Sequence, residues 1–322
     1  MTVLVSVLMP VHGSAPYLLE SVVSVINQDH ENWELILVLD RPTEDLTKTV
    51  DSLMERDKRI STLVSPGAGI VDALNFGLLN AKSELIARLD SDDIMERERL
   101  SVQSEYLMQK PEIVCLGTQM TFIDEKGKLL GSSRYPINYR QVRNNLKYQN
   151  CLGHPSVMYR KRQVIEAGGY RRILTGVEDY DLWLRLAKDL QIENLDQKLT
   201  KYRVSVGQYS KSFGEKYTIL EEAARLDSLF SFIKSIPENL QTLDTLNVGV
   251  KKARQKNFGK HPLKVTSSYQ GYLVSRIIRI ASTKKGKLIK LLKCIPFGLG
   301  LLIVAPLSFA SLLNQKLKGP SQ

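Results

Sequence analysis

Residues 84–93, Glu-Leu-Ile-Ala-Arg-Leu-Asp-Ser-Asp-Asp, end a short apolar run on three carboxylates within four positions. The run from Leu85 to Leu89 has the length of a buried strand, so the sequence predicts a strand that delivers acidic groups to a loop. Like charges placed so close repel one another unless a cation offsets them. A hard divalent ion, Mg²⁺ or Mn²⁺, bound with a phosphorylated ligand fits the cluster because it prefers oxygen ligands. A solvated acidic turn that caps the following helix is the alternative that this stretch alone leaves open.

Apolar strands and helices alternate around this stretch, from residue 3 to about residue 110. The sequence predicts strands at residues 3–9, 34–39, 60–64 and 85–89, and helices at residues 16–28 and 72–82. Such alternation is typical of an α/β fold with a mainly parallel sheet and helices on both faces. Ligands bind beyond the carboxyl ends of such strands. We therefore expect the turn at residues 10–14, Asp40 and the acidic stretch 90–93 to share one edge.

A second acidic pair, Glu178 and Asp179, opens a predicted helix over residues 178–187. The helix dipole favours acidic residues in a first turn, so simple capping is the alternative to a functional role for this pair. Further strands are predicted at residues 113–116, 120–123 and 157–159, and further helices at residues 140–148, 162–167 and 215–233. The three Cys and four His residues are scattered without metal-ligand spacing, which argues against a zinc site and indicates reduced thiols.

Five stretches, in this order and spacing, together resemble the motifs of the family 2 glycosyltransferases. They are residues 5–11 (VSVLMPV), 34–40 (ELILVLD), 73–78 (ALNFGL), 86–94 (IARLDSDDI) and 176–185 (GVEDYDLWLR). The resemblance covers residues 3 to about 205 and is to inverting members of the bacterial cell-envelope and polysaccharide type. It implies a GT-A fold, which is Rossmann-like, with a mainly parallel sheet flanked by helices.

The resemblance implies that a sugar passes from a nucleoside-diphosphate sugar to an acceptor hydroxyl, with inversion at the anomeric carbon. Asp92 matches the main ligand of a divalent ion, Mn²⁺ or Mg²⁺, and Asp90 would assist it or hold the ribose. Such an ion stabilises the negative charge that grows on a departing diphosphate. Asp40 would accept a hydrogen bond from a ring N–H of the base. The positions that match the nucleotide-sugar pocket are Pro10, Val11, His12, Asp40, Asp90 and Ser91.

The same resemblance assigns the acceptor side. Asp179 would take the proton from the attacking hydroxyl, and such general-base assistance is worth about 10² to 10⁴ in rate. Glu178 would orient that base or a donor hydroxyl. His154 matches a family position near the acceptor, with a buried histidine of no direct role as the alternative, and Trp183 and Arg185 are further acceptor-side candidates.

Two positions depart from the family pattern. Leu39 stands where the family often has the first of two aspartates, and Arg41-Pro42 replaces the usual small residues, which puts the form of the base pocket in doubt. Ser205 stands where many members carry histidine, which puts a metal or phosphate contact from that loop in doubt.

The net charge of +11 arises at the end of the chain. Residues 251–322 hold 15 of the 45 Lys and Arg residues and no Asp or Glu, and from Cys294 to Gln315 there is no charged residue. Each basic side chain near an anionic leaflet contributes about 1 kcal/mol, and about 20 apolar residues span a bilayer. We therefore expect this basic helical region to associate with an anionic membrane surface, at the cytoplasmic face of the cell membrane, and not with nucleic acid. A membrane span, an interfacial hairpin and a buried helix of a soluble domain all stay open.

The sequence thus predicts a GT-A domain over residues 1–210, a helical extension over 211–250 and a membrane-associating tail over 251–322. The expected enzyme is an inverting, hexosyltransferase-type glycosyltransferase that acts on a glycan or lipid-linked glycan. A catalytically silent nucleotide-sugar-binding scaffold is one alternative, which Leu39 and Ser205 leave open. A nucleotidyltransferase is a second alternative, but it would need a basic phosphate loop that residues 10–16 lack.

Overall fold

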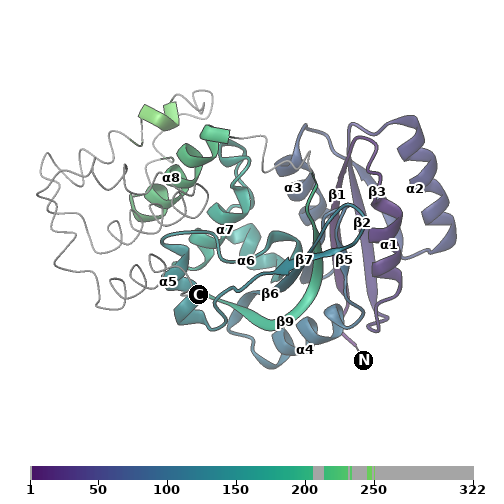
Figure 1. Cartoon of the computed structure of the whole chain (residues 1–322), viewed down its shortest axis with the longest axis horizontal. Helices are drawn as coiled ribbons and strands as arrows, with labels where there is room; N and C mark the ends of the chain where they lie inside the picture. Colours follow the sequence, from purple (N-terminus) through teal and green to yellow (C-terminus); the bar gives the residue numbers. More distant parts are fainter. Residues whose placement is uncertain (1, 206–213, 231–232, 234–244, 249, 251–322) are drawn as a thin grey trace, which may run out of the picture. The chain divides into compact units, whose positions relative to one another are not determined.

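The computed structural model describes residues 2–205, 214–230, 233, 245–248 and 250 (Figure 1). Nine strands form one sheet in the order β3-β2-β1-β4-β8-β6-β9-β5, and β7 pairs with β6. The strands are β1 (Val5–His12), β2 (Trp33–Asp40), β3 (Ile60–Val64), β4 (Leu85–Arg88), β5 (Ile94–Met95), β6 (Ile113–Ile123), β7 (Leu129–Ser132), β8 (Met158–Arg160) and β9 (Gln191–Arg203). The α-helices are α1 (Leu18–Ile26), α2 (Glu44–Arg56), α3 (Ile70–Asn80), α4 (Arg99–Gln109), α5 (Tyr139–Leu146), α6 (Lys161–Glu166), α7 (Glu178–Leu186) and α8 (Gly214–Phe230), with short 3-10 helices η1 (His154–Ser156) and η2 (Arg172–Leu174).

The predicted α/β fold class is confirmed, and its parallel character belongs to the first half of the sheet. β3, β2, β1 and β4 are all parallel, because a helix returns the chain between successive strands. β8 then pairs antiparallel with both β4 and β6. Beyond β8, β9 runs parallel to β6, whereas β7 and β5 are antiparallel to their partners. The parallel strands deliver their carboxyl ends to one edge, as the sequence predicted.

Helices cover both faces of the parallel strands (Figure 1). On one face the core joins β1 and β2 to α1, α2 and α4, with Val5, Val7, Met9, Leu35, Leu37, Val22, Val50 and Leu100 among its members. On the other face α3 packs closely at Gly77. A Cβ atom at that position would come within 2.2 Å of Leu8 and 2.7 Å of Val38. The sandwiched strands explain why these segments are almost continuously apolar.

Several elements differ from the predicted ones. β1 continues through residues 10–12, where a turn was predicted, because these residues pair in parallel register with β2. The two strands predicted at residues 113–116 and 120–123 are one strand, β6, whose polar centre is buried. There Thr118 donates a hydrogen bond to the carbonyl of Gln119 and Gln119 donates to the carbonyl of Tyr135, so these polar side chains are satisfied inside the fold.

The helix predicted at residues 215–233 is present as α8, and charged side chains attach it to the preceding fold. Arg171 pairs with Asp227 of α8 at 2.8 Å and also with Asp181 of α7. Both carboxylates are almost fully buried. Removing one partner of such a buried pair leaves an uncompensated charge, so the pairing fixes α8 against α7.

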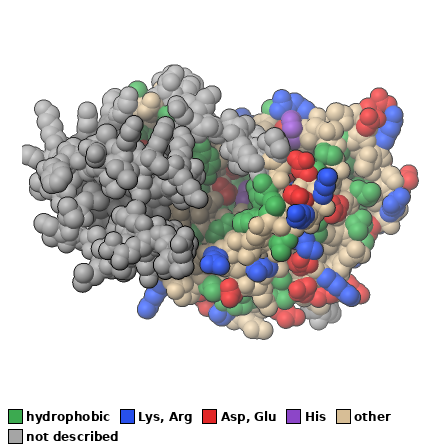
Figure 2. All heavy atoms as spheres, viewed as in Figure 1, with side chains coloured by type: hydrophobic (Ala, Val, Ile, Leu, Met, Phe, Trp, Pro, Cys, Tyr) green, Lys and Arg blue, Asp and Glu red, His purple; other side chains and the backbone are tan. Residues whose placement is uncertain are grey.

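The predicted tail over residues 251–322, including Cys294, lies outside the described residues. Cys115 and Cys151 are buried free thiols. Within the described part of the chain, none of the helices has both the length and the apolar character needed to cross a bilayer. On the face shown in Figure 2, Lys and Arg side chains alternate with Asp and Glu over the described residues.

Candidate active site

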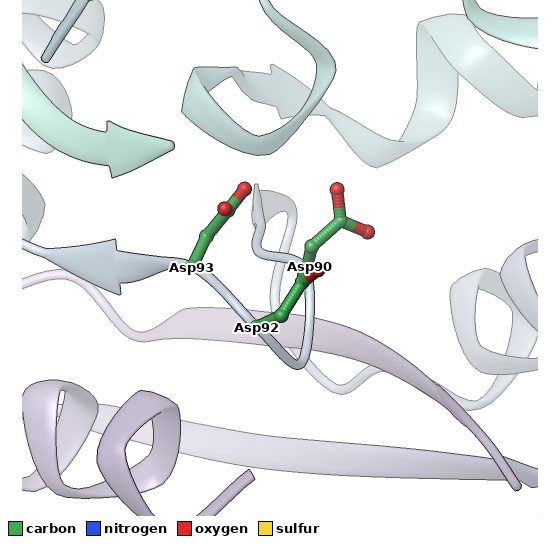
Figure 3. A group of neighbouring side chains, drawn as sticks. All are labelled: Asp90, Asp92 and Asp93. Carbon is green, nitrogen blue, oxygen red and sulfur yellow. The ribbon is translucent and has the colours of Figure 1, made fainter. Parts of the chain in front are cut away.

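The acidic stretch forms a short loop between β4 and β5. Carboxylate oxygens of Asp90, Asp92 and Asp93 lie within 4.8 Å of one another (Figure 3). Arg203 at the end of β9 fastens this loop, because its backbone N–H donates to Asp93 at 2.8 Å and its Nε donates to the carbonyl of Asp92 at 2.9 Å. Arg88, the last residue of β4, is buried and pairs with Asp90. The loop is therefore held in place by two buried guanidinium groups.

Burial and the repulsion between neighbouring carboxylates make Asp92 and Asp93 hard to ionise. Burial, followed by the charge of Asp90, raises the pKa of Asp92 to about 6. The same two causes, with the charge of Asp92 added, raise the pKa of Asp93 well above its usual value. In the described part of the chain, the Oδ2 atom of Asp93 is buried without a hydrogen-bond partner. Three clustered carboxylates with an unsatisfied oxygen suit a hard divalent cation, so the residues fit the ion that the sequence predicted.

A cavity of about 430 Å³ opens beside this loop. It brings together residues that are distant in the chain: Arg88, Asp90, Asp92, His154, Glu178 and Asp179 all line it. Aromatic and polar side chains complete the described lining, among them Phe122, Tyr135, Asn150, Tyr202 and Ser205. Five of the acidic and histidine residues predicted from the sequence therefore share one space.

Glu178 and Asp179 enter the cavity from the first turn of α7. Both also accept hydrogen bonds from nearby backbone groups: Glu178 from Gly176 N–H at 2.5 Å, before the helix, and Asp179 from Tyr180 N–H at 2.6 Å, in its first turn. The second oxygen of Asp179 accepts a hydrogen bond of 2.8 Å from the amide of Asn150. These contacts still leave both carboxylates at the cavity wall.

The two carboxylates differ in how readily they ionise. Burial, followed by the charge of Asp179, raises the pKa of Glu178 to about 7. Burial also raises the pKa of Asp179, but hydrogen bonds from Tyr180 and Asn150 and the charge of Arg88 counteract it. Asp179 is therefore the better candidate for an ionised base at neutral pH, with Glu178 partly protonated beside it.

His154 is held by aromatic neighbours at the cavity wall. Its Nε2 lies 3.0 Å from the hydroxyl of Tyr170, and its ring meets Trp183 edge-on at 6.0 Å between centroids. Burial, followed by the charge of Arg88, lowers its pKa well below the usual value. His154 is thus a neutral imidazole in the resting protein.

The residues predicted for the base pocket form a second cluster at the ends of β1 and β2. His12 pairs with Asp40 at 3.0 Å, and Arg41 contacts the other oxygen of that carboxylate at 3.2 Å. The backbone N–H of Gly69 also donates to Asp40. Pro10, Val11, His12, Asp40 and Ser91 are absent from the described lining of the cavity.

Comparison with known proteins identifies the family. The family model described as glycosyl transferase family 2 matches residues 6–169. The chain belongs to this family.

Named relatives agree with this assignment. The O-antigen biosynthesis glycosyltransferase WbnJ of Escherichia coli is 31% identical over 205 residues, which cover 62% of this chain and 80% of WbnJ. The amylovoran biosynthesis glycosyltransferase AmsE of Erwinia amylovora is 33% identical over 189 residues, which cover 57% of this chain and 69% of AmsE. The crystal structure of S. aureus TarS 1-349 in complex with UDP-GlcNAc has the same fold, with a TM-score of 0.58 and 17% identity over 88% of this chain and 82% of TarS 1-349.

Two acceptor-side candidates of this glycosyltransferase lie behind the cavity wall and not on it. Trp183 is fully buried against His154 and Tyr159. Arg185 binds the carboxylate of Asp181 and the carbonyl of Gly169. Trp183 thus contacts the lining residue His154, whereas the partners of Arg185 do not line the cavity in the described part of the chain.

Sequence patterns gave no role to three residues that the structure places at this glycosyltransferase's cavity. Arg88 carried a weak signal, since it is the one charge in an apolar run and stands two positions before Asp90. Tyr135 and Asn150 lie in loops that have no periodic pattern, so their position became visible only in the fold.

Proposed function

We propose that this glycosyltransferase moves a hexose from a nucleoside-diphosphate sugar to the hydroxyl of a glycan or lipid-linked glycan, with inversion, in the synthesis of cell-envelope polysaccharide. The observation that carries the proposal is the meeting of the acidic loop with Glu178 and Asp179 in one cavity. The acidic loop is suited to a divalent cation, and the pair Glu178 and Asp179 is suited to accepting a proton. A base activates the nucleophile of a single displacement, and the cation stabilises the diphosphate that leaves.

At the donor end, Asp92 and Asp90 would hold Mn²⁺ or Mg²⁺, with Asp93 behind them. When bound, the ion supplies positive charge to the departing diphosphate. Asp40 would accept a base N–H, with Pro10, Val11 and His12 lining the base and Ser91 beside the sugar. His12 and Arg41 are exposed and can move aside to free the Asp40 carboxylate. The UDP-GlcNAc complex of TarS 1-349, which has the same fold, supports a nucleotide-sugar donor.

At the acceptor end, Asp179 would take the proton from the attacking hydroxyl. Asn150 holds one oxygen of this carboxylate, so the group cannot rotate freely and its free lone pairs stay aimed at the cavity. Glu178, being partly protonated, can donate to a substrate hydroxyl or keep Asp179 in place. His154 would contact the acceptor as a neutral hydrogen-bonding group, with Trp183 and Arg185 positioning that wall.

For the whole chain we propose a catalytic unit over residues 1–210, a helical extension over residues 211–250 and a basic tail over residues 251–322. The 15 Lys and Arg residues of the tail, with no acidic residue among them, would attract an anionic membrane at its cytoplasmic face. Deleting the tail should release the protein from the membrane fraction. Retention of the shortened protein would count against this part of the proposal.

Hydrolysis of a panel of UDP-, GDP- and dTDP-sugars by the full-length protein tests the donor end. We expect one donor to be cleaved, only with Mn²⁺ or Mg²⁺, and Asp92→Asn to abolish that cleavage. Asp179→Asn should still bind the donor but lose transfer. Asp51→Asn, an exposed carboxylate on α2, is the matched control and should behave as wild type.

The silent-scaffold alternative makes the opposite prediction. A scaffold would bind a nucleotide sugar without turnover under every metal condition, and neither Asp92→Asn nor Asp179→Asn would alter a measured rate. Binding without cleavage would therefore replace the transferase proposal with the scaffold.

A further inference from the structure

The hydroxyl of Tyr135 is a free polar group at the cavity. Tyr135 is partly buried and lines the cavity. Among the described residues, no hydrogen bond of this hydroxyl is present, whereas the buried Tyr159, Tyr170 and Tyr180 hydroxyls all have partners. A tyrosine hydroxyl can both donate and accept, so Tyr135 offers a substrate two kinds of hydrogen bond.

The backbone of Tyr135 is fixed even though its hydroxyl is free. The buried side chain of Gln119 accepts from Tyr135 N–H at 2.8 Å and donates to Tyr135 C=O at 2.9 Å. Ser133 adds a third hydrogen bond to the same Gln119 amide. These bonds fix the backbone from which the Tyr135 side chain extends into the cavity, so the main chain loses little entropy when a ligand binds.

The free hydroxyl belongs to the neighbourhood of the proposed base. Burial, followed by the charge of Asp179, raises the pKa of Tyr135 to about 12. Tyr135 therefore keeps its proton at neutral pH. Tyr135 and Asp179 line the same cavity, so an acceptor that reaches Asp179 there also meets the protonated hydroxyl of Tyr135.

The charges of the lining indicate what kind of acceptor fits. Asp90, Asp92, Glu178 and Asp179 line the cavity, and Arg88 is the only Lys or Arg in its described lining. Arg88 forms an ion pair with Asp90, so the one described Lys or Arg of the lining already faces a carboxylate of the acidic loop. At the acceptor end, a carboxylate or phosphate placed beside Glu178 and Asp179 would meet repulsion.

Aromatic rings supply the other half of a sugar subsite. Phe122 and Tyr202 both line the cavity and pack edge to face, with ring centroids 6.0 Å apart. Such rings present apolar surface to the C–H faces of a pyranose, while Tyr135 and Asp179 present polar groups to its hydroxyls. The combination suits an uncharged sugar.

We propose that Tyr135 binds a hydroxyl of an uncharged acceptor sugar and holds that sugar in front of Asp179. This inference rests on the proposed function, in which Asp179 is the base. It adds the class of the acceptor unit that enters the cavity and the residue that positions it.

Tyr135→Phe in the full-length protein tests the proposal by removing one oxygen atom. The hydroxyl has no described partner, so the melting temperature should not change. The matched control is Tyr139→Phe. The hydroxyl of Tyr139 accepts a hydrogen bond from Arg143 on the exposed face of α5. Transfer would be measured from the donor that the panel identifies to methyl glycosides of neutral hexoses, and in parallel to methyl glucuronides and hexose 6-phosphates.

We expect Tyr135→Phe to raise KM for the neutral glycoside about tenfold, the size of one lost hydrogen bond to substrate, while KM for the donor changes less than twofold. Tyr139→Phe should match wild type, and the anionic acceptors should be at least about tenfold poorer than the neutral ones. An unchanged acceptor KM, a parallel rise of both KM values, or a preference for an anionic acceptor would overturn the inference. Asp179→Asn separates the two levels: if that variant transfers at the wild-type rate, the proposed function itself is wrong.

Discussion

Replacing Asp92 by Asn should stabilise the metal-free protein while removing its response to metal. Burial and Asp90 raise the pKa of Asp92 from 3.8 to about 6. One pKa unit corresponds to about 1.4 kcal/mol, so ionised Asp92 destabilises the fold by at most about 3 kcal/mol at pH 7.5. Asp92 is partly exposed, which reduces this figure, and we expect Asp92→Asn to gain about 1–3 kcal/mol. At about 2–4 °C per kcal/mol, the melting temperature should rise by several degrees.

The sign of the pH dependence follows from the direction of the shift. A carboxylate whose pKa is raised by folding binds its proton more tightly in the native state, so wild-type stability falls as pH rises from about 4 to about 6. At pH 3.5 Asp92 is mostly protonated in both states, so most of the advantage of Asp92→Asn should disappear. Thermal melts in EDTA at pH 3.5 and pH 7.5, with Asp51→Asn as the control, measure this difference.

Metal completes the same experiment. Added Mn²⁺ should raise the wild-type melting temperature at pH 7.5, because an ion that binds only the native state stabilises it. Asp92→Asn should lose most of that rise. A variant that melts below wild type in EDTA at pH 7.5, or that keeps the full response to Mn²⁺, would refute the reasoning about this loop.

Two further substitutions probe the base and the packing under the site. Asn150→Ala removes a hydrogen bond that favours ionised Asp179, so the pKa of Asp179 should rise. The acid limb of the pH profile of kcat/KM should then move to higher pH, with kcat/KM roughly tenfold lower on that limb. An acid limb at the same pH as in wild type would show that Asn150 does not act on the base. Gly77→Ala should destabilise the protein by about 1–3 kcal/mol in urea unfolding, because its Cβ would clash with Leu8 and Val38; an unchanged midpoint would mean that α3 moves away from the sheet at no cost.

The sequence was most informative where apolar runs alternate with acidic ends. The strand at residues 60–64 was predicted with its observed bounds, and β4 and α7 were found within one residue. The second half of the sheet was harder to predict. β9 was not predicted because its residues 196–198 are exposed and polar in the middle of the strand. β6 was predicted as two strands because Thr118 and Gln119 are polar, although they are buried, and so interrupt the apolar pattern of the strand.

For the candidate site too, residues at the ends of elements were easier to predict than residues in loops. Asp90, Asp92, Glu178 and Asp179, which the resemblance singled out, stand at element ends, and the structure places all four in the lining of one cavity. The partners that tune them could not be predicted, because their contacts depend on loops and on pairings between distant segments. Arg203 contacts the acidic loop from the end of β9, and Asn150 donates to Asp179 from a loop 29 positions earlier in the chain.

The stereochemistry of transfer tests the central claim most directly. If Asp179 activates the acceptor hydroxyl for a single displacement on the donor sugar, the new glycosidic bond must have the anomeric configuration opposite to that of the donor. NMR of the product formed from the donor that the panel identifies would give this configuration from the chemical shift and coupling constants of the anomeric proton. We predict inversion, lost together with transfer in Asp179→Asn. Retention of configuration, or wild-type transfer by Asp179→Asn, would contradict the account.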